Sequence, residues 1–588
     1  MTIGKALDGK PYAGNPHVRF EEGEVAPAAT PRRGSLLYNL NTGHSVQARR
    51  IAAWFAAAGI SFALTASAAR PMALVIMLDG CRADAVENAT APNLQKLMAG
   101  QWQPGYRCAS SLTAHTIPDG PTHSAPNHAA IATGVTSAKT NVRSNREFGN
   151  CDYSKWPSWL VRLVDAQPDK KALFVYSWRT DEQLSPSEKV EFLHGGDVAN
   201  GGALAKRLAS PDAPDATLFF INLPDHGGHG AGYNPYTTEY QRTVRISDAI
   251  VGRCLAAIAA RPTFAEEDWL IIVTADHGGY LKTHAATNGQ TRTIPFMVVG
   301  KRVAQGRIPG CPRNYDAAPT ALAHFGIDIS KMELDGRVVG GDALAESPRT
   351  LKDGLAAYFP FDSRAPQNAM QGGIVAETNG VALSGTPGGF TGCFLNLRPT
   401  TNEVAFVRLK GSERLAFENG ADFTAAMWVR MDEPQKGDPV IFGNKNWKSG
   451  LNPGIALIGA FTSSGFAKRG VSFNCGVADE RVRLDEALYE IDYGRWEFYA
   501  VTRSADGVLT IYQGSACGRF YWIADEAKAL KLTTGMPFCI GQDGTGRYGS
   551  TFAGGVDDFA LWTRALTRDE VRRIYEAGRQ GTALGELL

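Results

Sequence analysis

Short apolar runs alternate with helical stretches from residue 73 to about residue 345. Between the runs, residues 240–258 carry apolar side chains at helical spacing, and this pattern ends near Pro262. Alternation of this kind predicts an α/β domain with a mostly parallel central sheet, and such sheets bind ligands at the carboxyl ends of their strands. The runs that we interpret as buried strands are Ala73–Leu78, Ala172–Tyr176, Thr217–Asn222, Leu270–Thr274 and Pro295–Val299.

The pattern changes from about residue 355, where glycine-rich turns multiply and strand-like runs follow one another. This pattern predicts an all-β sandwich, followed by a short helix over residues 567–577. We therefore expect two folded domains, at residues 70–350 and 351–588. The strand-like runs of the second are Phe423–Arg430, Trp496–Arg503, Leu509–Tyr512 and Val556–Trp562.

The N-terminal region is typical of a targeting segment. Residues 1–45 show no periodicity, and we expect an unstructured leader there. Arg49 and Arg50 then precede an apolar run that ends in small residues, which predicts a signal peptide over residues 46–69. The protein would then be exported to a periplasm or the extracellular space; an uncleaved membrane anchor is the alternative. The unusual depth of the signal suggests translation from Val46 through a non-Met start codon.

Composition narrows the classes of partner. Lys+Arg is 60 and Asp+Glu is 59, so a net charge of +1 excludes a globally basic nucleic-acid binder. The apolar run at residues 51–64 is short for a stable membrane span.

Nine cysteines make an odd count, and Cys81 is our candidate for the free thiol. The even set in the second half permits two bridges there: Cys393, Cys475, Cys517 and Cys539.

Histidine localises the chemistry in the first half, because none of the 11 histidines lies beyond His324 and eight fall between His115 and His284. Carboxylates and imidazoles also follow the predicted strands, where the carboxyl ends of parallel strands would bring them together. Mixed Asp/His ligation suits zinc, and two such ions could polarise a phosphoryl oxygen. The candidate ligands are Asp79, Asp225, His229, Asp276, His277 and His284.

Ser124 is the candidate nucleophile. It opens a helical pattern, where the positive potential of the helix N-terminus favours an alkoxide and an incoming phosphate. A serine at this place can also serve simply as a helix cap. With a metal site nearby, both roles can hold together.

These residues, in this order, resemble the alkaline phosphatase superfamily, in its type I phosphodiesterase / nucleotide pyrophosphatase branch, over about residues 72–345. His284 also precedes an Ile-Pro-Phe strand, as a late histidine does in that branch. The segments that carry the resemblance are Leu78-Asp79-Gly80-Cys81-Arg82, Ser124-Ala125-Pro126-Asn127-His128, Pro224-Asp225-His226-Gly227-Gly228-His229 and Asp276-His277-Gly278.

The resemblance implies two Zn²⁺ sites and a nucleophilic Ser124 that reaches toward both metals. It also implies that Asn145 holds a phosphate oxygen, because the family has an Asn at this distance from the nucleophile. The implied zinc ligands are Asp225, His229 and His284 for one ion, and Asp79, Asp276 and His277 for the other.

Several alternatives stay open. The usual nucleophile of this branch is Thr, whereas this chain has Ser. A phosphomonoesterase, a sulfatase or a phosphonate hydrolase could use the same scaffold, although His128 stands where sulfatases have Arg. Trp178 and Arg179 follow a predicted strand and are candidates for substrate contact; Arg179 would suit a second phosphate charge. We expect a phosphate-ester small molecule or a nucleotide as the substrate, and no nucleic-acid polymer.

The second half resembles laminin-G-like, concanavalin A-type jelly rolls over about residues 355–580. The resemblance implies the fold but not a function, because function depends on the sites that a fold carries. A glycan contact is one reading, and a glycan-binding surface protein is the non-enzymatic alternative for the whole chain. The segments that carry this resemblance are 357–362, 423–430, 496–502 and 554–562.

Overall fold

The computed structural model describes residues 69–588 except residue 286 and residues 346–348, 416–420, 434, 436, 462–469, 477–482 and 527–532. The predicted leader and almost all of the predicted signal peptide lie outside the described residues. Residues Ala69–Leu588 form one compact unit. The boundary that we place between residues 350 and 351 stays a prediction.

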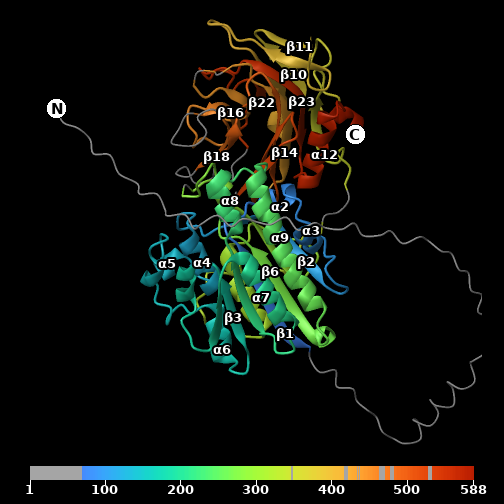
Figure 1. Cartoon of the computed structure of the whole chain (residues 1–588). Helices are drawn as coiled ribbons and strands as arrows, with labels where there is room; N and C mark the ends of the chain where they lie inside the picture. Colours follow the sequence, from blue (N-terminus) through green and yellow to red (C-terminus); the bar gives the residue numbers. More distant parts are fainter. Residues whose placement is uncertain are drawn as a thin grey trace, which may run out of the picture. The chain divides into compact units, whose positions relative to one another are not determined.

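The α/β part is built on one sheet whose strand order is β4-β3-β5-β1-β6-β7-β2-β8 (Figure 1). The five strands from β4 to β6 are parallel, whereas β7 runs antiparallel to both β6 and β2. The mostly parallel sheet predicted from the sequence is therefore confirmed. Its strands are β1 (Arg70–Leu78), β2 (Arg107–His115), β3 (Ala172–Tyr176), β4 (Val190–His194), β5 (Ala216–Ile221), β6 (Glu267–Thr274), β7 (Thr293–Gly300) and β8 (Gly306–Arg307).

Helices pack around this sheet in two groups. In one group α3, α7 and α8 contact α9, and Figure 1 shows α7 and α9 side by side. In the other group α4, α6 and α11 contact one another. The helices are α2 (Ala83–Asn88), α3 (Pro92–Met98), α4 (Ser124–Thr133), α5 (Ser137–Thr140), α6 (Trp159–Ala166), α7 (Asp197–Ala209), α8 (Leu223–Ala231), α9 (Thr238–Ala259), α10 (Gly289–Arg292) and α11 (Ala317–His324).

The five strands expected in this part are all present, within a few residues of the expected ends. Strands β2 and β4 were not predicted, because their sequences mix polar and apolar side chains. In β4 only Val190 is fully buried, as fits a strand at the edge of the sheet. In β2, buried Ser111 and His115 interrupt the apolar pattern.

The second half is an antiparallel β-sandwich, as predicted. One sheet has the order β10-β13-β22-β15-β16-β17-β18 and the other β11-β12-β23-β14-β19-β20-β21, with β9 (Leu355–Phe359) paired to β23. The strands of the first sheet are β10 (Val375–Asn379), β13 (Phe406–Lys410), β22 (Phe538–Ile540), β15 (Val440–Gly443), β16 (Ile455–Phe461), β17 (Gly470–Gly476) and β18 (Arg483–Glu490). Those of the second are β11 (Ala382–Pro387), β12 (Cys393–Leu397), β23 (Gly554–Trp562), β14 (Phe423–Arg430), β19 (Trp496–Arg503), β20 (Val508–Ser515) and β21 (Phe520–Glu526).

Two further sequence expectations concern the second half. The predicted helix is present as α12 (Arg568–Arg579). The two disulfide bridges that the even cysteine set permits do not form, because all nine cysteines of the chain are unpaired. Cys81 is a buried free thiol, as expected, although it shares that state with most of the other cysteines.

The sandwich and the α/β part share a hydrophobic core. Ala83 and Leu112 of the α/β part lie in the same buried cluster as Phe520 and Trp522 of β21. Trp522 also donates its indole N–H to the carbonyl oxygen of Leu112 at 3.4 Å. Among the described residues, no helix is both long and apolar enough to cross a membrane.

Candidate metal centre and nucleophile

Strand order brings the three candidate carboxylates together. Strand β1 lies between β5 and β6, so Asp79 after β1 meets the segments that follow its two neighbours. The Gly80 N–H donates to Oδ1 of Asp276 at 2.9 Å, and the side-chain amide of Asn222 donates to Oδ2 of Asp79 at 2.6 Å. Asp225, in the first turn of α8, completes the set.

Gly80 allows this close approach. Its φ is +69°, and a Cβ atom there would lie 2.8 Å from the Cα of Asp225. Only glycine combines a left-handed backbone with so short a contact. The turn after β1 can therefore pack directly on the start of α8, which brings Asp225 next to Asp79.

The three candidate histidines share one orientation. In each, Nδ1 lies within hydrogen-bond distance of a backbone carbonyl oxygen: Gly278 for His277 (2.7 Å), Thr122 for His284 (2.6 Å) and Lys282 for His229 (2.9 Å). Because a carbonyl oxygen can only accept, the ring proton belongs on Nδ1 and the Nε2 lone pair stays available to a metal. A hydrogen bond from the ring nitrogen that does not bind the ion is typical of metal-binding histidines.

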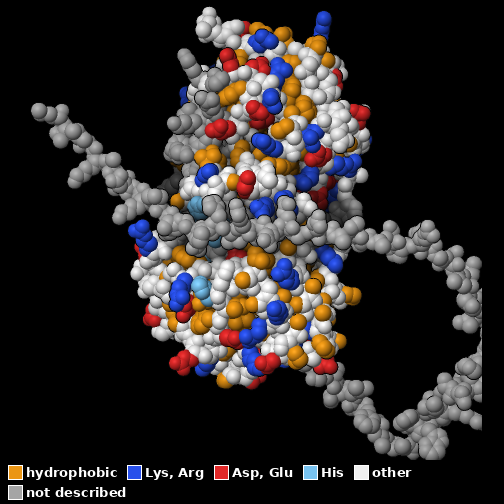
Figure 2. Space-filling view, viewed as in Figure 1, with side chains coloured by type: hydrophobic (Ala, Val, Ile, Leu, Met, Phe, Trp, Pro, Cys, Tyr) orange, Lys and Arg blue, Asp and Glu red, His pale blue; other side chains and the backbone are white. Residues whose placement is uncertain are grey.

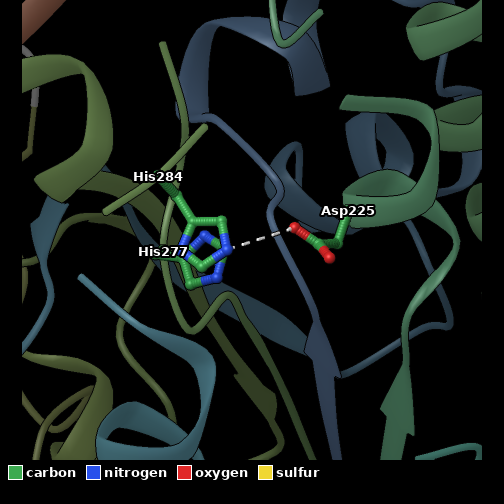
Figure 3. A group of neighbouring side chains, drawn as sticks. All are labelled: Asp225, His277 and His284. Atoms are coloured by element: carbon green, nitrogen blue, oxygen red, sulfur yellow. Dashed lines mark ion pairs between the residues drawn. The ribbon is translucent and has the colours of Figure 1, made fainter. Parts of the chain in front are cut away.

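The Nε2 atoms converge on the carboxylates. The rings of His277 and His284 stack with their centroids 3.8 Å apart. Nε2 of His284 lies 3.9 Å from Oδ1 of Asp225 (Figure 3). His277 Nε2 lies 3.2 Å from Oδ2 of Asp276 and 3.5 Å from Oδ1 of Asp79. In two groups, potential ligand atoms lie within 4.8 Å of one another: Asp79, Asp276 and His277, and Asp225, His277 and His284.

His229 lies at the edge of this centre. Its Nε2 is 3.5 Å from Oδ1 of Asp225, and its side chain is 48% exposed. The sequence assigned His229 and His284 to one ion and His277 to the other. The structure brings five of the six predicted ligands into two compact groups, with His277 common to both, and places His229 beside Asp225 at their edge.

The electrostatics of the centre favour a bound cation. Oδ1 of Asp79 and Oδ2 of Asp276 are buried and have no hydrogen-bond partner in the described structure. Burial and the neighbouring charge of Asp276 raise the pKa of Asp79 to about 7, and burial also raises the pKa of Asp225 and Asp276. Burial holds the pKa of His277 well below its usual value. Buried carboxylates facing the neutral imidazoles of His277 and His284 fit divalent metal ions, and this donor set suits zinc.

Ser124 lies against this centre. It is the first residue of α4 and is 5% exposed, and its Oγ is 3.1 Å from Nε2 of His277. The exposed Asn145 accepts a hydrogen bond from the Ala125 N–H at 3.0 Å through its side-chain oxygen. Ser124 and Asn145, the two residues predicted to act on the phosphoryl group, thus meet at the N-terminus of α4.

The structure adds residues to which the sequence gave no role. His128 lies beside the centre: its Nδ1 is 2.8 Å from Oδ1 of Asp181, and its Nε2 is 3.2 Å from Oδ2 of Asp276. Tyr233 donates its hydroxyl hydrogen to Asp225. His128 belongs to a quoted motif and could have been singled out, whereas Tyr233 and Asp181 belong to no motif.

The two substrate-contact candidates lie in different surroundings. Trp178 is half-buried and packs edge-on against His128 and Phe148. Arg179 is exposed and lines a surface pocket of about 560 Å³ together with Thr180, Glu182, Gln183, Pro186 and Phe192. Neither position tests a role in substrate binding, which stays a prediction.

Comparison with known families agrees with both resemblances. The family of type I phosphodiesterases / nucleotide pyrophosphatases matches residues 73–162, and the concanavalin A-like lectin/glucanases superfamily matches residues 405–572. The first match includes Asp79, Ser124 and Asn145. The ligands from Asp225 to His284 lie beyond it and rest on the geometry.

Curated relatives match about a third of the chain or less. GPI ethanolamine phosphate transferase 1 of Emericella nidulans is 24% identical over 225 residues, which are 35% of this chain and 24% of that protein. The chain spans about a quarter of the length of the curated relatives that it matches.

Solved structures of two further proteins overlap part of the chain. A protein of the alkaline phosphatase superfamily from Vibrio parahaemolyticus overlaps 47% of this chain and 71% of its own, with a TM-score of 0.37 and 17% identity. Murine ectonucleotide pyrophosphatase / phosphodiesterase 5 overlaps 44% of this chain and 96% of its own, with a TM-score of 0.34 and 12% identity.

Proposed function

We propose that this protein is an exported, zinc-dependent hydrolase of phosphoric esters. The match of residues 73–162 to the type I phosphodiesterase / nucleotide pyrophosphatase family supports the proposal. One observation carries the proposal: Oγ of Ser124 lies 3.1 Å from Nε2 of His277, a histidine common to both compact groups of potential metal ligands. A nucleophile and a two-metal centre so close together suit phosphoryl transfer.

The reaction follows from the position of Ser124. Its Oγ attacks phosphorus, the bond from phosphorus to the leaving oxygen breaks, and the phosphoryl group stays on the serine until water releases it. The positive potential at the start of α4 would stabilise the phosphoryl oxygens, and Asn145, whose side-chain oxygen accepts from the Ala125 N–H, would hold one of them. Two zinc ions held by the six ligands would supply the positive charge that ionises the serine hydroxyl and neutralises the phosphate.

Charge distribution supports a small substrate. On the face drawn in Figure 2, Lys and Arg side chains alternate with Asp and Glu, in keeping with the net charge of +1. A mixed surface of this kind does not attract a nucleic-acid polymer. We therefore propose a phosphodiester or a nucleotide as the substrate class.

The proposed role of Ser124 is tested by Ser124→Ala. Turnover should fall by at least about 10³-fold, the order of loss when a covalent nucleophile is removed, while zinc per chain stays at the wild-type level. Ser137→Ala is the matched control, because Ser137 is also buried and also begins a helix, yet lies outside the metal groups. Activity that survives Ser124→Ala would exclude this serine as the nucleophile.

Substrate class is tested with the zinc-loaded wild-type protein on p-nitrophenyl phosphate, a phosphodiester, a phosphonate ester and a sulfate ester. The proposal expects the phosphodiester to be cleaved most efficiently. Preference for the monoester, the sulfate or the phosphonate would favour the corresponding alternative enzyme. Binding to a glycan array without any hydrolysis would favour the glycan-binding alternative.

The N-terminal sequence of the mature protein tests export, with cleavage expected near residue 69.

A further inference from the structure

Tyr233 is held in a slot between two glycines of the metal-ligand motifs. It follows α8 and is fully buried. A Cβ atom on Gly228 would lie 2.2 Å from Cε1 of the tyrosine ring, and one on Gly279 would lie 2.2 Å from its Cγ. The ring therefore fills the space that these two glycines leave open. This close packing gives a physical reason for the second glycine in both Gly227-Gly228 and Gly278-Gly279.

The hydroxyl of Tyr233 reaches a metal ligand. It donates a hydrogen bond to Oδ1 of Asp225. The same oxygen faces two of the predicted ligands, at 3.5 Å from Nε2 of His229 and 3.9 Å from Nε2 of His284. The hydroxyl thus acts on the carboxylate oxygen that faces the metal position.

The backbone of Tyr233 is tied to the same region. Its N–H donates to the carbonyl oxygen of Leu281 at 2.7 Å, in the turn that leads to His284. Leu281 has φ of +50°, a left-handed conformation that is costly for a leucine. The surroundings must hold this turn in place, and the bond from Tyr233 is one of the contacts that do so.

We propose that Tyr233 is a positioning residue for one of the two metal sites, fixing Asp225 and the His284 turn relative to each other. This inference rests on the proposed function, because it presumes that Asp225, His229 and His284 bind a metal. A carboxylate on a short side chain can rotate, and the tyrosine hydroxyl selects the rotation that presents Oδ1 to His229 and His284. Loss of such an outer contact typically weakens metal binding by about 10–100-fold.

The test is Tyr233→Phe in the full chain, with zinc binding measured by competition against a chromophoric chelator. The ring still fills the slot between the two glycines, so the fold should be kept. We expect one zinc ion per chain to bind about 10–100-fold more weakly and the other to bind as in the wild type. Tyr106→Phe is the matched control, because Tyr106 is also buried but its hydroxyl accepts from the backbone N–H of Trp269, in strand β6.

Other outcomes separate this proposal from the function on which it rests. Wild-type affinity for both ions in Tyr233→Phe would overturn the positioning role and leave the metal centre intact. Equal weakening of both ions would also overturn it, because the change would then reflect a general disturbance. A wild-type protein that binds no zinc would overturn the proposed function itself. Gly279→Ala is a second variant, and it should weaken the same ion by displacing the ring.

Discussion

At the scale of single residues, His128 holds together carboxylates that would otherwise repel one another. Its Nδ1 contacts Oδ1 of Asp181 at 2.8 Å, while its Nε2 lies 3.2 Å from Oδ2 of Asp276 and 3.5 Å from Oδ2 of Asp79. Burial alone would lower the pKa of His128, but the charge and hydrogen bond of Asp181 hold the pKa well above its usual value. The imidazole is therefore the positive partner of a buried acidic cluster.

We expect His128→Leu to be strongly destabilising, by about 3–5 kcal/mol, because it leaves Asp181 buried without a partner. The double variant His128→Leu with Asp181→Leu should lose less than the sum of the two single variants, since neither member of this pair is then left buried without the other. Denaturant unfolding of the zinc-free proteins measures this, and removing zinc keeps metal affinity out of the comparison. Additive losses would show that the two side chains do not act as a pair.

At the scale of elements, α12 shows how local sequence can specify a helix. The Glu570 N–H donates to the side chain of Thr567 at 3.2 Å, and the carboxylate of Glu570 accepts from the Thr567 N–H at 2.8 Å. This capping box satisfies backbone donors at the start of the helix. Val571, Ile574 and Tyr575 recur at helical spacing and are buried. Cap and spacing are both readable in the sequence, which is why this helix was predicted closely.

The cap gives a prediction for the element as a whole. Thr567→Ala should lower the free energy of unfolding by about 1 kcal/mol, the usual cost of a lost N-cap. Thr237→Ala is a matched control, because Thr237 precedes α9 in the same way but makes no side-chain capping bond. Thermal or denaturant unfolding distinguishes the two variants. Equal losses would mean that the capping bond of Thr567 contributes nothing of its own.

At the scale of the whole molecule, β18 of the sandwich contacts the turn that follows Asp79, and β21 packs against β18 there. Arg82, in the turn after Asp79, donates to the carbonyl oxygen of Gly279 at 2.8 Å, and its guanidinium lies 5.4 Å from the ring centroid of Tyr489 in β18. Tyr489 in turn packs on Tyr521 of β21, with ring centroids 4.0 Å apart. The sandwich therefore supports the loops that follow Asp79 and His277.

His115 makes this interface sensitive to pH. Its Nε2–H donates to the carbonyl oxygen of Ala524 at 3.0 Å, and its Nδ1 faces the guanidinium of Arg313 at 3.5 Å. Burial lowers the pKa of His115 to about 4; Arg313 and Arg292 add to this, while Asp525 opposes it. The unfolded chain, with a pKa near 6.5, then binds more protons than the folded chain between about pH 6.5 and pH 4.

Above about pH 6.5 the contribution of neutral His115 to the free energy of unfolding should therefore be complete. This contribution should decline as the pH falls toward 4, because the unfolded chain then takes up a proton that the folded chain does not. At pH 5 the loss from this group should be at most about 2 kcal/mol. The measurement is denaturant unfolding at pH 7 and pH 5, compared between the wild type and His115→Gln, which keeps a donor for Ala524 but does not titrate. An identical pH dependence in the two proteins would contradict the prediction.

The sequence by itself determined the fold class, the two-part organisation and the candidate metal ligands. Periodicity is a local property, so the buried strands and helix α9 were visible in it. Asp79 and Asp276 close to strand ends likewise needed no long-range information. The five parallel strands then placed these residues at one edge, as a parallel sheet must.

Only the tertiary structure decided how these residues are grouped and which side chains pack against them. His277 became common to both ligand groups, and Tyr233 was inserted between Gly228 and Gly279, because strand order set β1 between β5 and β6. The contact of Arg82 with Tyr489 joins residues about 400 positions apart. Such contacts depend on which surfaces meet after folding, and the pattern of residues along the chain does not specify this.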